Sequence, residues 1–497
     1  MSDTAASSGH LSRQLGLLGL TATGICSMLG ASVYVVPFMI QRSVPGIGPW
    51  VLPAFLFAAI PALLAAMAYA ILASAMPRAG GSYLYASRGL HPYLGFVASF
   101  SQWFGLSIVI GVIAYVTIPF LGDAARALGW TGVADLLSGG FVRVSLALLL
   151  LWTFVGVNLL GARFYERTLI PLMGLMFALG AIVIVAGFSA APGDFADALQ
   201  AREGRSLPAS DAPPLTPGVF LSAAAILFSS FIGFDAIAQA GGEAARPGRN
   251  LPLAIGLAVG TVGTYYFLFT SAVYHAVPWS FVAAEAQVRD VSAPGLFGYL
   301  LPAGWAAAII AGAAIALIND LPAMLLAVSR LMFAWAEDGI FPRRIAAVHQ
   351  ERNTPHLAIL LSGAMASIGI LGSHFAGDFF LGIDIMVTSM LVNFLLMCLS
   401  VLTLPARNPE LAERITVFRS RAIQRVIAVS GLVMLTLFLV VHVYRDLNAE
   451  VAAWYFHSTP VWLIVMSIAT AIYLREFRRL HRHGVDTDEL FRRLPAE

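Results

Sequence analysis

The sequence predicts an all-α integral membrane protein with twelve transmembrane helices. Of its 497 residues, 59% are hydrophobic and only 11% are charged, and the mean hydropathy is +0.82. Soluble domains carry about 25% charged residues, so this chain lacks the surface charge to coat a water-soluble globule of its size. Its apolar runs are about 20 residues long, which is the length of a membrane-crossing helix rather than of a barrel strand.

The apolar runs divide the chain into twelve spans, whose edges the pattern fixes only to within several residues. They lie near residues 15–40, 50–76, 94–120, 141–161, 168–190, 217–243, 252–278, 303–335, 356–375, 379–404, 423–444 and 457–475. The organisation predicted from them is an N-terminal tail (1–14), a first five-span half (15–190), an external loop (191–216), a second five-span half (217–404), two further spans with their preceding loop (405–475), and a C-terminal tail (476–497).

The arginines predict the orientation. All 29 basic residues are arginine, and 22 of them fall on the side that also carries both chain ends. Cytoplasmic loops of membrane proteins carry the excess of basic residues. We therefore expect a multi-pass protein of the cell (inner or plasma) membrane with both termini in the cytoplasm, which agrees with the even number of spans.

Small and polar residues interrupt the first and sixth spans. The first changes character at residues 26–32, around Gly30, and the sixth changes at residues 228–235, around Gly233, with Asp235 directly after the break. A weakened helix is tolerated in hydrocarbon only where it is packed in protein or lines a wet cavity, and an intramembrane carboxylate usually marks a pathway. Interrupted spans at matching positions of two halves are typical of inverted-repeat transporters. The alternative is a pair of helices kinked for packing, with a neutral, hydrogen-bonded Asp235.

Three further polar residues lie in apolar surroundings. Asn319 and Asp320 are adjacent in the eighth span, just before a proline. Asp320 is a candidate to bind a cationic substrate, to carry a coupled proton or to pair with an arginine. Glu243 lies near Arg246 and Arg249, which predicts an ion pair at the cytoplasmic end that breaks when an inner gate opens.

Other classes of function find no support in the residues. Cys26 and Cys398 both lie in apolar spans, so we expect no disulfide framework. The sequence shows no metal-ligand spacing and no phosphate-binding loop, so we expect neither an enzyme nor an ATP-driven pump, and no metal or cofactor. The net charge of +2 gives no indication of nucleic-acid binding.

Five landmarks in order along the chain resemble the amino acid–polyamine–organocation permeases. They are the glycine-rich first span (residues 24–34), the loop Met76-Pro-Arg-Ala-Gly-Gly-Ser-Tyr83, the segment Gly233-Phe-Asp235 with Glu243 and Pro247-Gly-Arg-Asn-Leu-Pro252, the segment Ser329-Arg-Leu331 with Asp338-Gly-Ile-Phe-Pro342, and Leu404-Pro-Ala-Arg-Asn-Pro-Glu410. The resemblance covers roughly residues 15–420. It implies a leucine-transporter-type fold of two inverted five-helix repeats (5+5) with discontinuous helices 1 and 6, followed here by two C-terminal helices.

The resemblance also implies a binding site at the two breaks. Backbone N–H groups in the first break would hold a substrate carboxylate, since a helix N-terminus favours anions, and carbonyls of the sixth span would hold an ammonium group. The substrate-binding residues implied are Ser27, Met28, Leu29, Gly30, Ala31, Ser32, Phe228, Ser229, Ser230, Phe231, Gly233 and Asn319, and the gating or coupling residues are Asp235, Asp320 and Glu243.

The function expected is secondary active transport of an amino acid or related amine by alternating access. The driving force would be a proton in symport or exchange against a second solute, and the protein would be a monomer or homodimer in contact with membrane lipid. The competing hypotheses are a non-transporting sensor of the same fold, an exchanger of polyamines or other cationic amines, and an ion channel.

Overall fold

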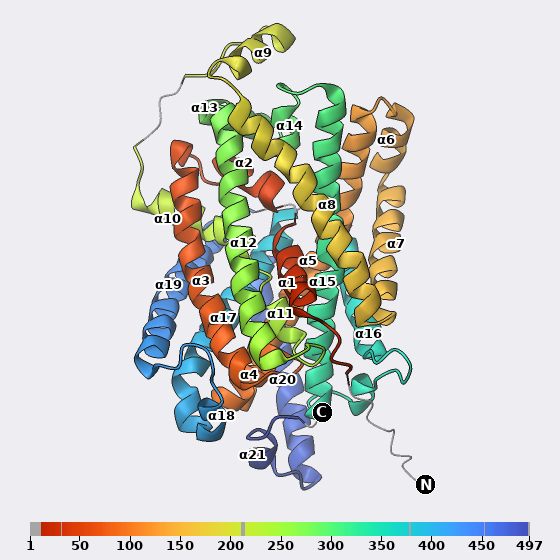
Figure 1. Cartoon of the computed structure of the whole chain (residues 1–497), viewed down its shortest axis with the longest axis vertical. Coiled ribbons are helices and arrows are strands. Elements are labelled where there is room, and N and C mark those ends of the chain that lie inside the picture. Colours follow the sequence, from red (N-terminus) through yellow and green to blue (C-terminus); the bar gives the residue numbers. More distant parts are fainter. Residues whose placement is uncertain (1–10, 31, 210–213, 377–378, 452, 496–497) are drawn as a thin grey trace.

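The computed structural model describes residues 11–30, 32–209, 214–376, 379–451 and 453–495. Over these ranges the regular structure is helical, and β-type pairing is limited to two isolated bridges. Twelve helical segments are long and apolar enough to cross a membrane, which confirms the predicted fold class. Figure 1 shows the long helices running roughly parallel along the long axis of the molecule.

The two ends of the helix bundle carry different short helices (Figure 1). The end at which the described chain begins and finishes, here called the terminal end, carries α4 (Gly81–Gly89), α18 (Pro409–Glu413) and α21 (Thr487–Leu490). The opposite end, here called the distal end, carries α6 (Thr131–Ser138), α9 (Asp194–Glu203), α13 (Trp279–Val288) and α14 (Ala293–Phe297).

The first span is divided into α1 (Leu17–Met28) and α2 (Ser32–Ser43). Leu29 and Gly30 lie between them outside the helical pattern, and Ala31 lies outside the described residues. A side chain at Gly30 would overlap the carboxylate of Asp320, so a larger residue here would displace that carboxylate. The predicted interruption of the first span is therefore confirmed.

The sixth span is divided in the same way. The helix α10 (Pro217–Leu227) passes into the 3-10 turn η2 (Phe228–Phe231), and helical winding returns only in the four-residue α11 (Ala236–Gln239). Between them Gly233 adopts a φ of 134°, a conformation that side-chain-bearing residues rarely adopt. A Cβ there would overlap the carbonyl of Ser27, so the break in the sixth span packs directly against the end of α1.

The remaining spans are continuous helices. They are α3 (Val51–Ala75), entered through η1 (Gly48–Trp50), α5 (Pro92–Ala127), α7 (Gly140–Leu159), α8 (Ala162–Ser189), α12 (Pro247–Ala276), α15 (Ala303–Glu337), α16 (His356–Ala376), α17 (Phe379–Arg407), α19 (Arg421–Leu447) and α20 (Ser458–Arg482). Two short 3-10 turns, η3 (Arg343–Ala346) and η4 (Trp454–Phe456), precede α16 and α20.

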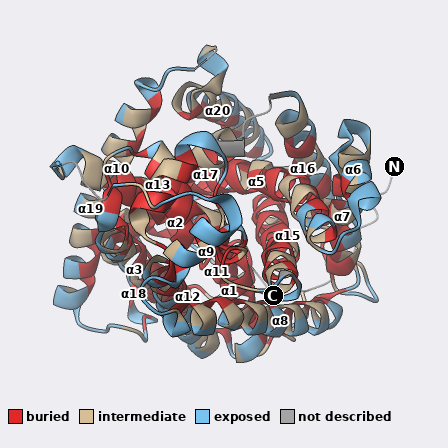
Figure 2. Cartoon of the chain, turned by 90° about the horizontal axis from the view of Figure 1, so that it is seen from above, coloured by how far each residue is buried: buried red, intermediate tan, exposed pale blue. Residues whose placement is uncertain are grey.

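The interior is built on α5 and α15, which pack against each other and against α16, α17, α1 and α8. Figure 2 shows buried residues concentrated on α1, α2, α5, α11, α15 and α17, with exposed residues around the rim. The exposed surface of rim helices such as α19 and α20 is apolar, with Val433, Val440, Leu463 and Ile468 all more than half exposed. Such a surface fits contact with lipid.

The loop between α3 and α4 explains the paired glycines of its motif. Gly80 has a φ of 75° and its backbone N–H donates to the Gln239 carbonyl at 3.2 Å. A Cβ on Gly80 would overlap Ala334 of α15, and one on Gly81 would overlap the backbone of Ala238 in α11. The glycines therefore let this loop insert between α11 and α15 at the terminal end.

Candidate functional site

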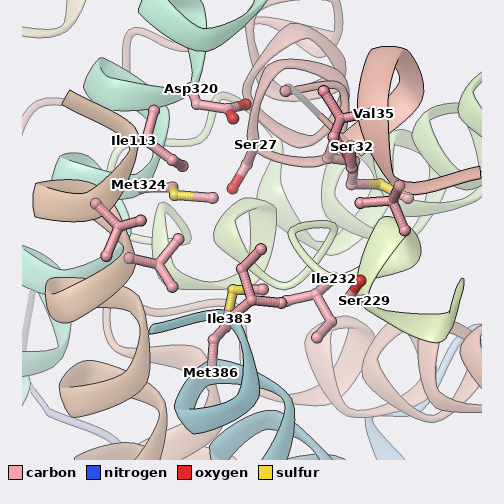
Figure 3. Close-up of a pocket in the computed structure, with 15 residues that line it drawn as sticks. Ser27, Ser32, Val35, Ile113, Ser229, Ile232, Asp320, Met324, Ile383 and Met386 are labelled. Atoms are coloured by element: carbon pink, nitrogen blue, oxygen red, sulfur yellow. The ribbon is translucent and has the colours of Figure 1, made fainter. Parts of the chain in front are cut away.

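A pocket of about 60 Å³ lies where the two interrupted spans meet (Figure 3). This volume holds only a few water molecules. The pocket is lined from α1, α2, η2 and its flanking residues, α5, α15 and α17, by Ser27, Met28, Gly30, Ser32, Val35, Val36, Val109, Val112, Ile113, Ser229, Ile232, Asp320, Met324, Ile383 and Met386. The helix α2 and the first turns of α17 lie between the breaks and the distal end of the bundle. The pocket, which they help to line, therefore extends from the breaks toward the distal end.

Hydroxyl groups and the backbone hold the first break in shape. The Tyr266 hydroxyl on α12 donates to the Met28 carbonyl at 3.0 Å and also bonds the Ser32 hydroxyl. The Ser27 hydroxyl lines the pocket, and among the residues that the structure describes it has no hydrogen-bond partner. The first break thus presents an unused hydroxyl next to a fixed backbone turn.

Asp320 is the acidic group of the pocket. The residue is 3% exposed, and within the described part of the chain its Oδ1 has no hydrogen-bond partner. Figure 3 shows the carboxylate directed from α15 toward the α1–α2 segment and Ser27. The neighbouring Asn319 points elsewhere, because its Nδ2 donates to the Cys26 sulfur at 2.9 Å. An unpaired carboxylate buried in this way is costly and is a strong candidate to meet a cation.

Asp235 lies outside the pocket in a buried polar network. Its Oδ1 accepts from the Gly233 N–H at 3.2 Å, and its Oδ2 accepts from the Gln102 side chain on α5. The Gln102 Oε1 in turn accepts from Ser82 of α4, from Gln239 of α11 at 3.2 Å, and from Asn393 of α17 at 3.3 Å. Asp235 therefore joins the sixth span to three neighbouring helices on the terminal side of the break.

Glu243 forms a bidentate ion pair with Arg330. The guanidinium donates to its two carboxylate oxygens at 2.6 and 3.1 Å, and the two side chains are 1% and 2% exposed. We expected a partner among the adjacent arginines Arg246 and Arg249, but the partner comes from α15. Next to it the backbone of Leu15 pairs with Glu243 and Ala245, so this pair joins the start of α1 and the end of the sixth span to α15.

The C-terminal segment covers a second buried ion pair at the terminal end. Arg88 of α4 donates to both carboxylate oxygens of Asp338 at 2.5 and 2.8 Å. The Arg88 Nε also donates to the Arg493 carbonyl at 3.1 Å, and its guanidinium lies 5.4 Å from the centre of the Phe491 ring. Asn408, after α17, donates to the Arg492 carbonyl at 2.8 Å. The C-terminal segment therefore fastens α4 to the end of α17.

The structure brings together part of the residue set predicted from the sequence. Six of these residues line the pocket, namely Ser27, Met28, Gly30, Ser32, Ser229 and Asp320. The others described lie outside its lining, namely Leu29, Phe228, Ser230, Phe231, Gly233, Asn319, Asp235 and Glu243, and Ala31 falls outside the described residues. Phe228 packs on Phe394 and Phe438, and Phe231 on Phe55, so both rings face neighbouring helices.

Sequence reasoning missed the apolar wall of the pocket. Val109, Val112 and Ile113 of α5, and Ile383 and Met386 of α17, are common residues in apolar spans and carry no pattern that marks them. The network residue Asn393 could have been noticed, because an amide in an otherwise apolar span is unusual. Among the described residues, no group of three or more His, Cys, Asp or Glu side chains is arranged to hold a metal ion.

Comparison with known proteins places the chain among permeases. Residues 15–470 match the family described as amino acid permease. The chain is 27% identical to human cationic amino acid transporter 4 over 382 residues, which cover 72% of this chain and 55% of that protein. It is 26% identical to the branched-chain amino acid permease BcaP of Bacillus subtilis, over 82% of this chain and 84% of the permease. It is 24% identical to the methylthioribose transporter of the same organism, over 96% of both chains.

Proposed function

This chain belongs to the amino acid permease family, and we propose on that basis that it is a secondary transporter of an amino acid or a related amine, working by alternating access. The relatives are named for cationic amino acids, branched-chain amino acids and methylthioribose, and the aligned part spans only about half of the cationic amino acid transporters. The proposal therefore keeps the substrate class broad.

The observation that carries the proposal is the meeting of two broken helices at one buried pocket. Unwound backbone at this depth is stable only when it is packed or lines a cavity, and here it does both. N–H groups at the start of α2 suit an anionic group, and carbonyls around η2 suit an ammonium group. The predicted substrate-binding residues that lie outside the pocket lining stay predictions.

The closed terminal end supports the alternating-access part of the proposal. The Glu243–Arg330 pair and the network around Gln102 seal the terminal side of the breaks, whereas the pocket extends the other way. We propose that the terminal end is cytoplasmic, that the two halves of the chain are inverted repeats, and that a proton or a counter-substrate drives transport. We propose a monomer or homodimer as the working unit.

Uptake into proteoliposomes tests the function. Purified protein is reconstituted and offered a panel of labelled amino acids and amines, with and without a pH gradient. Saturable uptake that the gradient increases supports symport, and counterflow independent of the gradient supports exchange. Saturable binding without flux would mean that the protein is a sensor, and flux that does not saturate would mean a channel. Either of these two results would refute the proposal.

A further inference from the structure

The Asp320 carboxylate occupies a distinctive place in the pocket. It lies so close to Gly30 that any side chain there would overlap it, which places it against the break just before α2 begins. The start of this twelve-residue helix is where exposed N–H groups and the helix dipole favour an anion. Among the described residues, Asp320 also carries an unpartnered, buried Oδ1, and the hydroxyl of Ser27, which lines the same pocket, is unpartnered as well.

The rest of the pocket contains nothing to balance a second negative charge. Its lining residues include no basic side chain, and the whole sequence contains no lysine. Arg330, ten residues farther along α15, is bound by Glu243 through both carboxylate oxygens. A ligand carboxylate placed at the first break would therefore stand beside Asp320 without a protein cation, and while Asp320 is ionised the two like charges repel at such short range.

Resting on the proposed function, we propose that the transported solute is an organic ammonium ion without a carboxylate. Asp320 takes the place at the first break that the carboxylate of an amino acid would otherwise fill, and it receives the ammonium group of the solute. Ser27, in the lining of the same pocket, supplies a hydroxyl acceptor. The ammonium ion stabilises the buried carboxylate, so the carboxylate and the amine complement each other in charge.

The apolar wall defines the remainder of the solute. Ile113 and Met324 face the pocket on one side and Ile383 and Met386 on another (Figure 3), and Val109 also lines it. These side chains suit an aliphatic or thioether body and offer no partner to a second ammonium group. The solute is accordingly a monoamine with an apolar body rather than a polyamine.

Binding of matched ligand pairs to the detergent-purified full-length protein tests this inference. Each pair is an amino acid and the amine left after removal of its carboxylate, namely leucine with 3-methylbutylamine and methionine with 3-(methylthio)propylamine. Isothermal titration calorimetry should give the amine at least a tenfold lower Kd than its parent amino acid. Tighter binding of leucine or methionine, or no binding of either member of both pairs, overturns the inference.

Variants of Asp320 separate its charge from its structural role. Asp320→Asn should weaken amine binding at least tenfold and remove the preference for the amine over the amino acid, while Asp320→Glu should retain that preference. The matched control is Asp384→Asn, because Asp384 is also a carboxylate of the membrane region but pairs with Arg445 at 2.7 Å outside the pocket. An amine preference that survives in Asp320→Asn would overturn the inference.

The inference and the proposed function can fail separately. Uptake of amino acids in preference to amines would refute the inference and leave transport intact. Amine-selective binding that never produces flux in proteoliposomes would keep the ligand class and refute transport.

Discussion

The buried Glu243–Arg330 pair offers the sharpest test of the seal at the terminal end. In Glu243→Gln the shape of the side chain is kept, but the Arg330 guanidinium loses its countercharge at 1–2% exposure. Removing one partner of a buried ion pair costs about 3–5 kcal/mol. If the pair exists only in the sealed conformation, this cost destabilises that conformation and favours opening. Because about 1.4 kcal/mol changes an equilibrium constant tenfold, the ratio of open to sealed protein should rise by roughly 100- to several-thousand-fold.

The native thiol of Cys26 reports this opening. The chain has two cysteines, Cys26 and Cys398, and both are fully buried. The substitution Cys398→Ala therefore leaves one thiol, that of Cys26 on α1, close to the first break. Adding Glu243→Gln to that variant should increase the rate at which a small polar thiol reagent labels Cys26 by a factor approaching the shift in the open-to-sealed ratio. Mass spectrometry of the intact protein over a time course gives the rate.

Two comparisons decide the interpretation. The double variant Glu243→Met/Arg330→Met removes both charges, so its labelling should return toward the parent rate, because apolar replacement of a whole buried pair is often neutral. Asp290→Asn breaks an exposed pair with Arg42 and should change nothing, since such pairs contribute about 1 kcal/mol or less. An unchanged labelling rate in Glu243→Gln, with an unchanged melting temperature, would refute the role of this pair in the seal.

Three further outcomes are expected. Gly233→Ala should abolish transport and lower the melting temperature of the purified protein, because its Cβ would overlap the Ser27 carbonyl, whereas Gly263→Ala, which meets only one ring carbon at 3.9 Å, should behave like the parent in both assays. If Asp235 carries a coupled proton, Asp235→Asn should abolish gradient-driven uptake in proteoliposomes more than exchange; equal retention of both would restrict Asp235 to its structural network. Deleting residues 491–497 removes the backbone acceptors that join α4 to the end of α17. In the Cys398→Ala background, this deletion should increase the labelling rate of Cys26 several-fold. An unchanged rate would show that this segment is not part of the seal.

The number and type of the spans follow from the apolar runs along the sequence, but their ends do not. The fifth span was expected to begin at residue 168 and the helix begins at Ala162, while the third was expected to end at 120 and continues to Ala127. Both extensions contain charged residues, such as Arg163 and Asp123. An apolar run marks the part of a helix that contacts hydrocarbon, and the backbone hydrogen bonds continue past it into water or the lipid interface.

The site was predictable where its chemistry requires unusual residues. Gly30 and Gly233 are recognisable because each lies in a cluster of small and polar residues at matching positions of the two halves, and Asp320 because a carboxylate is expensive inside a membrane helix. The partner of Glu243 was not predictable, because Arg330 lies 87 residues away along the chain and only packing brings α15 to the sixth span. Nearby arginines in the sequence gave a plausible but different pairing.

One helix connects the proposed ligand contact with the seal. Asp320 and Arg330 both belong to α15, and ten helical residues place them about 15 Å apart along its axis. The groups that face them, Gly30 and Glu243, belong instead to the interrupted first and sixth spans, which also contact each other at Ser27 and Gly233. In the proposed alternating-access mechanism, opening of the terminal end would separate the two broken spans from α15. In the same mechanism, a solute held between Gly30 and Asp320 would bridge the boundary that the Glu243–Arg330 pair closes, so we expect solute binding to influence whether that pair breaks.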